Sequence, residues 1–585
     1  MAKHNNIKIL RISFIGLILF SSVLLSSCNE DRFLNEVPRD FLSPENALVT
    51  MENFDAALIG LYGKTRDNLY LSDLNIVFPS LAWVGTDLVY NFNPLGEDGS
   101  RPDWGGSILL PTNDPVVKLL WGIAYSIIYD ANVIISRSES EHSELTEVQK
   151  LQVQAEAAFF RGYMYKMLAN LYGGVPIVLE EIQSPRRDFT RADRNEVYEQ
   201  AASDLEFAAD YLEDIDETPD WRINRLAALH LLSEVYISLE RWTDAIEAAS
   251  RVIDHPNTAL MTERFGTMVD HPFLGGDVYW DLFRQGNQNR STGNTEAIWV
   301  LQFEFNVAGG GHETGGGGFG GGPRMERLMI PRLWQIEIPN YDGTRDLLVP
   351  APNTFYYGQG SGVARPSHFF FETLWERSGY DQDIRNSEYN IQRDFQVNNP
   401  ASDRNGEWIL KDEIPIRMES FVDTMRNFYP AIAKMSTIGQ HPVETYSSDQ
   451  TVEGSMGLGH NYRYRDTYVI RLAETYLLRA EAHLGNNNPG AAALDINVVR
   501  ERAKAPDVNP SEVDIEYILD ERARELYFES YRLLTLTRLG VLVERARKYN
   551  HWGGIMYHDH NNLWPIPFSE IEKNTQGNLE QNPGY

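Results

Sequence analysis

Hydrophobic and polar residues follow a helical period over much of the chain. Apolar positions that recur three and four residues apart indicate helices that bury one face. The run 147–171 is the longest, and Gly173-Gly174-Val175-Pro176 after it is a clear stop signal. The run 223–254 divides into two helices around Glu240 and Arg241. The full pattern predicts helices within residues 44–62, 147–171, 223–254, 466–484, 489–503 and 511–540.

Two of these runs match a 34-residue helix–turn–helix repeat of the tetratricopeptide type. The matching positions are Leu229, Leu232, Ser233, Tyr236 and Ala245 in the first copy, and Tyr476, Ala480, His483 and Ala492 in the second. Small residues let paired helices approach closely, and large ones fill the space between them. A generic helical hairpin shares part of this pattern. Because the copies lie about 250 residues apart, we expect a large insertion in the repeat scaffold.

Residues 256–465 form that insertion, and they are rich in glycine, proline, asparagine and aromatic residues. Glu296–Val307 is predicted to be a strand, and Gly309–Gly322 has ten glycines in fourteen positions. Such a segment cannot bury enough apolar surface to order itself, so it is predicted to be a mobile loop or one that is ordered only by a ligand or partner. A second loop-rich stretch covers 68–121. We therefore expect a mainly α fold, in which helical pairs carry an irregular insertion with short strands.

The first residues indicate export and lipidation. Lys3, Lys8 and Arg11 precede an apolar run from 12 to 25, which is too short to span a bilayer comfortably. It ends in Leu25-Ser-Ser-Cys28, the pattern cut by lipoprotein signal peptidase, and Cys28 is the only cysteine in the chain. We predict that Cys28 is acylated and anchors the protein to a membrane. The predicted division is 1–27 (signal peptide), 28–255, 256–465 (ligand-binding insertion) and 466–585.

The charge of the chain excludes some partners. With 83 acidic against 52 basic residues, the formal net charge is −31. A surface of this sign repels nucleic acid and anionic lipid, and we expect neither as a partner.

Catalytic and metal-binding patterns are weak. No Gly-x-Ser-x-Gly motif occurs, Cys28 is committed to lipid, and nothing singles out a pair among the many carboxylates. His558, Asp559 and His560 have metal-ligand chemistry, but alternate residues of an exposed loop point in opposite directions, which favours a solvated loop. We expect no enzyme activity, no cofactor and no metal.

Aromatic residues outside the helical runs point to a binding function. A flat ring suits the C–H face of a sugar, and neighbouring polar groups can bind its hydroxyls. Each ring alone is more often core than ligand contact, but at least one of Trp83, Tyr90 and Trp104 is expected to be exposed. The candidates are Trp83, Asp87, Tyr90, Asn91, Asn93 and Trp104 in the first loop region, and Trp280, Arg284, Phe319, Tyr356, Tyr357 and Trp375 in the insertion.

Several segments resemble the SusD/RagB family of nutrient-uptake lipoproteins. They are Ala155-Glu-Ala-Ala-Phe-Phe-Arg-Gly-Tyr163, the helix from Tyr468 to His483 with its Arg-Leu-Ala-Glu core, Ile518-Leu-Asp-Glu-Arg-Ala-Arg-Glu-Leu-Tyr-Phe-Glu529, and the closing Leu563-Trp-Pro-Ile-Pro and Gln581-Asn-Pro-Gly-Tyr585. Asn29-Glu-Asp31 is similar to the surface-export signal of Bacteroidetes lipoproteins. Residues 530–535 depart from the family pattern at what we interpret as a packing position, which leaves the expected fold unchanged.

The resemblance implies a function as well as a fold. It implies a tetratricopeptide-like scaffold, an outer-membrane location facing the cell surface, and a TonB-dependent SusC-like barrel as partner. The ligand is then a glycan or, in some members, a peptide. Two other classes stay open: a protein-interaction scaffold without a small ligand, and a cell-surface glycoside hydrolase, which needs two carboxylates about 5–10 Å apart.

Overall fold

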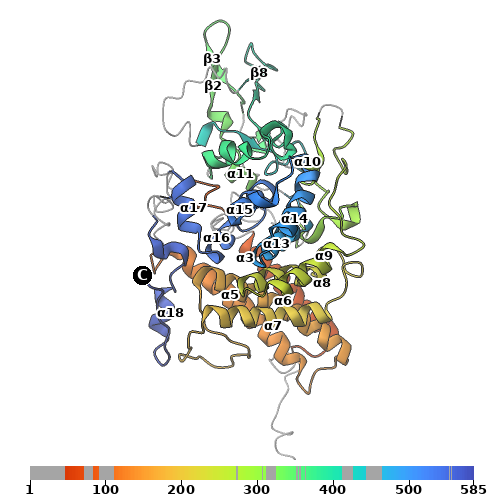
Figure 1. Ribbon diagram of the computed structural model, residues 1–585, viewed down its shortest axis with the longest axis vertical. Helices are drawn as coiled ribbons and strands as arrows, with labels where there is room; N and C mark the ends of the chain where they lie inside the picture. The colour runs from red at the N-terminus through yellow and green to blue at the C-terminus, as the bar shows by residue number, and fades with distance from the viewer. Residues whose placement is uncertain are drawn as a thin grey trace, which may run out of the picture.

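The computed structural model describes residues 47–70, 83–90, 111–271, 274–305, 307, 309–310, 325–350, 353–354, 358–362, 364–410, 426–442, 464–551, 554 and 557–585. Figure 1 shows a scaffold of long helices in the lower half and an irregular region of short elements at the top. The helices come from both ends of the chain, whereas the irregular region is the green middle part. The predicted mainly α fold with an irregular, strand-poor insertion is confirmed.

The scaffold consists of helices that bury one or more faces against each other. α6 is the most deeply placed, because α5 packs on one side of it and α7 on the other. Gly162 of α6 allows that approach, since a Cβ there would come within 3.0 Å of Leu205. The scaffold helices are α3 (Met51–Leu69), α5 (Pro115–Ser138), α6 (Glu147–Tyr172), α7 (Arg194–Tyr211), α8 (Arg225–Ser238), α9 (Trp242–Ile253), α13 (Leu472–Gly485), α14 (Pro489–Arg502), α15 (Ile515–Leu526), α16 (Arg532–Arg538), α17 (Leu542–Tyr549) and α18 (Phe568–Lys573).

Some predicted boundaries were wrong. α3 begins at Met51, after a capping box between Thr50 and Asn53, and not near residue 44. Residues 467–471 form a strand rather than the start of a helix, and 511–540 divides into α15 and α16. Four scaffold helices were not predicted: α7, α17, α18, and α5, whose first turns fall in the stretch predicted to be loop.

The two repeat copies stack on each other despite their separation in sequence. α8 packs with α9, α13 packs with α14, and α9 contacts α13. Ala245, Ala480 and Ala492 are fully buried at these contacts. Gly485 lies against Trp242, where a Cβ would come within 2.6 Å of the indole ring. Small residues at the predicted positions therefore allow the close helix packing.

The insertion is built from short elements and two-stranded ladders. β1 pairs antiparallel with β10, the strand that follows the insertion, with Val300 opposite Tyr468. The predicted strand 296–307 is shorter than expected, at Ala297–Leu301. The elements are α10 (Val278–Asp281), β1 (Ala297–Leu301), α11 (Met325–Met329), β2 (Glu337–Pro339), β3 (Arg345–Leu347), β4 (Asn353–Thr354), β5 (Gly358–Gln359), a π-helix (Phe369–Thr373), α12 (Leu374–Glu376), β6 (Ile391–Gln392), β7 (Phe395–Gln396), β8 (Trp408–Ile409), β9 (Ala431–Ile432), β10 (Thr467–Arg471) and single-turn 3₁₀ helices.

The insertion and the C-terminal helices share one hydrophobic core. Tyr527 and Phe528, which follow α15, pack against Phe370 of the insertion with ring centroids 5.0 and 5.4 Å apart. Trp83 completes the cluster, 5.1 Å from the ring of Phe528. The insertion is therefore fixed to the scaffold by apolar packing.

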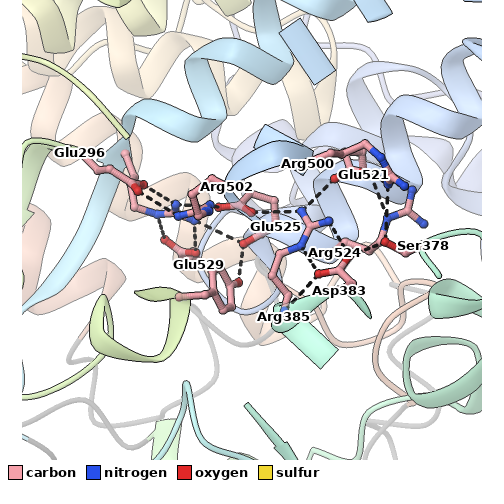
Figure 2. Close-up of polar contacts among 12 residues, drawn as sticks. Glu296, Ser378, Asp383, Arg385, Arg500, Arg502, Glu521, Arg524, Glu525 and Glu529 are labelled. Carbon is pink, nitrogen blue, oxygen red and sulfur yellow. Dashed lines mark hydrogen bonds and ion pairs between the residues drawn. The ribbon is translucent and has the colours of Figure 1, made fainter. Parts of the chain in front are cut away.

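A buried network of charges fixes the same junction (Figure 2). Glu521 and Glu525 lie one turn apart on α15, and both are fully buried. Arg385 of the insertion contacts both, at 2.8 Å and 3.1 Å. Arg471 of β10 binds Glu525 at 2.7 Å, and Arg500 of α14 binds Glu521 at 2.8 Å. Burial alone would raise the pKa of each carboxyl, but the arginines outweigh it, so both pKa values lie below the ordinary range.

The contact between α8 and α13 carries a pH-dependent prediction. Burial lowers the pKa of His230 to about 3, and its Nδ1 lies 2.8 Å from the Thr475 hydroxyl. Between pH 6.5 and 3 this histidine is protonated in the unfolded chain but stays neutral in the folded protein. The free energy of unfolding therefore falls as the pH falls. At pH 4.5 the cost is about 2–3 kcal/mol, and we expect His230→Gln to lack it. Urea unfolding at pH 7 and 4.5 measures the difference.

The exposed His142 provides the control for this prediction, because its side chain is 51% accessible. His142→Gln should lose as much stability on acidification as the unmodified protein. An equal acid response in His230→Gln would show that His230 contributes nothing to acid sensitivity.

Candidate ligand-binding region

The segment 83–90 lies where the insertion meets the C-terminal helices, and its centre is the carboxylate of Asp87. Arg532 of α16 donates two hydrogen bonds to it, at 2.5 and 3.0 Å, and Arg545 of α17 donates a third at 2.7 Å. Asp87 is fully buried. Burial would raise its pKa, but the two guanidinium groups hold that pKa well below the usual range. The segment is thus fixed to the scaffold by a buried ion triad.

The insertion holds the other side of the segment. The Ser367 hydroxyl donates to the Asp87 carbonyl at 2.6 Å, and the amide of Tyr90 donates to the Arg365 carbonyl at 3.0 Å. Asn550 spans the segment by donating to the carbonyls of Thr86 and Val89. The segment 83–90 is therefore clamped, which here means hydrogen-bonded to both the scaffold and the insertion. Residues 71–82 precede it and residues 91–110 follow it, and both stretches lie outside the described residues.

Five predicted contact residues are part of the core. Trp83, Asp87 and Trp375 have no exposed surface, and Tyr90 and Trp280 each retain 3%. Of the three rings of which at least one is expected to be exposed, Trp83 and Tyr90 are therefore buried, and Trp104 lies outside the described residues. The buried rings fill the junction, and the loop-like composition around them did not reveal it. The adjacent candidate Arg284 is also buried, 4.3 Å from the Trp280 ring.

The other candidates cannot be placed. Cys28, Asn91, Asn93, Trp104, Phe319, Tyr356 and Tyr357 lie outside the described residues. Their assignment to the ligand site stays a prediction.

The structure exposes aromatic residues that sequence reasoning did not select. Tyr341, in the β2–β3 turn, is 74% exposed, and Trp408 of β8 is 51% exposed. Both elements lie at the tip of the insertion, at the top of Figure 1. Arg404 lies over the Tyr341 ring at 5.6 Å, and Glu407 accepts a hydrogen bond from the Tyr341 hydroxyl. An aromatic residue inside the turn Asn340-Tyr-Asp-Gly343 is the signal that could have found this ring.

The His558–His560 segment corrects another expectation. His558 is the N-cap of a 3₁₀ helix, Asp559–Asn562, and the two imidazole rings stack with centroids 5.5 Å apart rather than pointing in opposite directions. Asp559 pairs with Arg547 at 2.8 Å. Within the described ranges, the group with ligand atoms close enough for a metal is Asp214, Asp216 and His255, which lies in the scaffold.

Comparison with known proteins identifies the class. The family model described as "SusD family" matches residues 295–585, and the one described as "Starch-binding associating with outer membrane" matches residues 108–237. The chain belongs to the SusD/RagB family.

Individual relatives agree with this assignment. SusD-like protein P25 of Formosa agariphila is 24% identical over 96% of this chain and 97% of its own length. Starch-binding protein SusD of Bacteroides thetaiotaomicron is 37% identical over 128 residues, which are 21% of this chain and 22% of that protein. The solved structure of a laminarin-binding SusD-like protein has a TM-score of 0.61 at 22% identity, covering 92% of this chain and 100% of that one.

Proposed function

We propose that this protein captures an oligosaccharide at the cell surface and passes it, uncleaved, to a TonB-dependent SusC-like barrel in the outer membrane. The observation that carries the proposal is the nearly full-length likeness to SusD-like proteins. Of the relatives compared, one is named for laminarin binding and another for starch binding. Their names describe binding rather than catalysis, which supports a protein that does not cleave its ligand.

The clamped segment 83–90 supports a ligand position close to the chain that follows it. It joins two stretches of chain to a rigid junction, and the second of them carries Asn93 and Trp104. We assign ligand contacts to Asn93, Trp104, Phe319 and Tyr356, and add the exposed Tyr341. When a binding loop is attached to a fixed segment of this kind, it loses less conformational entropy on binding, and this favours affinity.

Titration with laminarihexaose and with maltoheptaose tests the proposal, and Trp104→Ala tests the site. A ring that stacks on a sugar contributes about 0.5–1.5 kcal/mol, so the variant should bind up to about tenfold more weakly. Its melting temperature should not change. Isothermal calorimetry and thermal melting measure the two effects, and chromatography should recover the sugar intact.

Trp83→Ala is the matched control, because Trp83 is buried against Phe528. Its truncation should cost about 3–5 kcal/mol of stability. Binding of an unrelated peptide instead of either glycan would favour the peptide-binding alternative. Shortened sugar in proportion to protein concentration would contradict the proposed function.

Membrane attachment is proposed to depend on Cys28, the only cysteine in the chain. Cys28→Ala removes the sulfur to which lipid would be attached, and each buried CH₂ of an acyl chain is worth ~0.8 kcal/mol. We expect the variant to lose fatty-acid labelling and to leave the membrane fraction. Cys28→Ser, which keeps size and polarity, should behave in the same way. Continued labelling of either variant would refute lipidation at this residue.

A further inference from the structure

An apolar groove lies on the scaffold, far from the insertion. Its walls are the outer face of α5, the chain after α6, and α18, which Figure 1 shows in the lower part of the molecule. Its volume is about 460 Å³, within the range of small-molecule sites. The lining is mostly apolar and includes Trp121, Tyr125, Ile128, Tyr129, Ile182 and Phe189.

The apolar surface of α5 is unusual. Among the described helices, α5 is long and apolar enough to cross a membrane, yet only 50% of its most apolar window is buried in the protein. Its other faces pack on α3 and α6, as expected of a core helix. The remaining face forms the groove wall, so this surface is available to an apolar ligand.

Three polar side chains of the groove already bind the protein backbone. Asn132 donates to the Val178 carbonyl at 2.9 Å, and the Tyr125 hydroxyl donates to the Pro176 carbonyl at 2.7 Å. Asn574 both donates to and accepts from the backbone of Phe189. A sugar in the groove would have few partners for its hydroxyls, which is costly when they are desolvated. The groove therefore favours an apolar body over a glycan.

Gly122 is an exposed residue that lines the groove. A Cβ at this position would meet nothing within 4 Å, so no neighbouring atom requires a glycine. A glycine inside a helix costs roughly 0.5–1 kcal/mol relative to alanine. The missing side chain leaves this part of the groove open.

Lys118 supplies a positive charge one helical turn before Gly122, on the same face of α5. It is exposed at the groove and makes no ion pair among the described residues. The net charge of −31 repels anions at long range, so any attraction must come from charges at the groove itself. Glu570 and Lys573 also line the groove, but they pair with each other at 2.8 Å. Among the described lining residues, Lys118 is therefore the charge that complements an anionic head group.

We propose that this groove binds an anionic amphiphile, with its acyl or aryl body against α5 and its head group beside Lys118. This site is separate from the proposed glycan site, and its test does not depend on that function. The ligand class follows from the apolar lining, the satisfied polar groups and the single unpaired lysine.

Fluorescence titration with 1-anilinonaphthalene-8-sulfonate, followed by displacement with dodecanoate, tests the proposal. Gly122→Leu should abolish the saturable site, because the leucine side chain would occupy space in the groove beside Lys118. Gly60→Leu on α3 is the matched control, since Gly60 is also helical and a Cβ there also meets nothing within 4 Å. Its binding should equal that of the unmodified protein.

Lys118→Glu tests the charge in a variant whose exposed substitution leaves the fold intact. It should weaken dodecanoate up to about fivefold, the range of an exposed ion pair, and leave the neutral dodecanol unchanged. Unchanged probe binding in Gly122→Leu, or displacement of the probe by laminarihexaose, would overturn the proposal.

Discussion

Replacing Glu525 with glutamine is expected to lower the free energy of unfolding by about 3–5 kcal/mol, the cost of breaking a buried ion pair. The carboxylate lies between Arg385, Arg471 and Arg502 and is fully buried. Glutamine preserves the shape of the side chain but leaves the guanidinium groups short of one negative charge. Urea unfolding at pH 7 measures the loss.

Acidification should reduce this difference. Because the folded pKa of Glu525 lies below its usual range, its stabilisation is present above about pH 4.5 and is lost as the pH falls. The difference between the two proteins should therefore shrink below that pH.

Glu570→Gln is the surface control. Glu570 pairs with Lys573, whose side chain is 67% exposed, so its removal should cost less than about 1 kcal/mol. Equal losses in Glu525→Gln and Glu570→Gln would mean that the buried network contributes no special stability.

The charges of α15 show what a sequence pattern can and cannot reveal. The segment Ile518–Glu529 was recognised as a family helix, but its alternating acidic and basic residues are also typical of a solvated face. In the structure Glu521, Arg524 and Glu525 are fully buried. Their partners come from β10, α14 and the insertion, and a helical period carries no information about such distant residues.

Some of the predicted binding residues are buried for a related reason. Trp83, Tyr90 and Trp280 lie in stretches with little helical period, which made exposure a reasonable expectation. Their burial depends on tertiary packing, and Trp83 contacts Phe528, about 445 residues later in the chain. The repeat helices were easier to predict, because their small and large residues act within one local hairpin.

The ion triad at Asp87 links stability to the proposed binding site. Asp87→Asn keeps the backbone contacts to Ser367 and Asn550 but removes the charge that pairs with Arg532 and Arg545. We expect a loss of about 3–5 kcal/mol in unfolding free energy. We also expect weaker glycan binding, because segment 83–90, which precedes the proposed contacts Asn93 and Trp104 in the chain, loses its anchor. Asp559→Asn, at a side chain 92% exposed, should change neither quantity.

A double-mutant cycle with Trp104→Ala separates positioning from general destabilisation. The affinities are measured by calorimetry at a temperature where circular dichroism shows all four proteins folded. If Asp87 acts by positioning the segment that carries Trp104, its substitution should weaken binding much less in the Trp104→Ala background. Additive losses would show that the two residues affect the ligand independently. An unchanged affinity in Asp87→Asn, with the expected drop in stability, would limit the triad to a structural role.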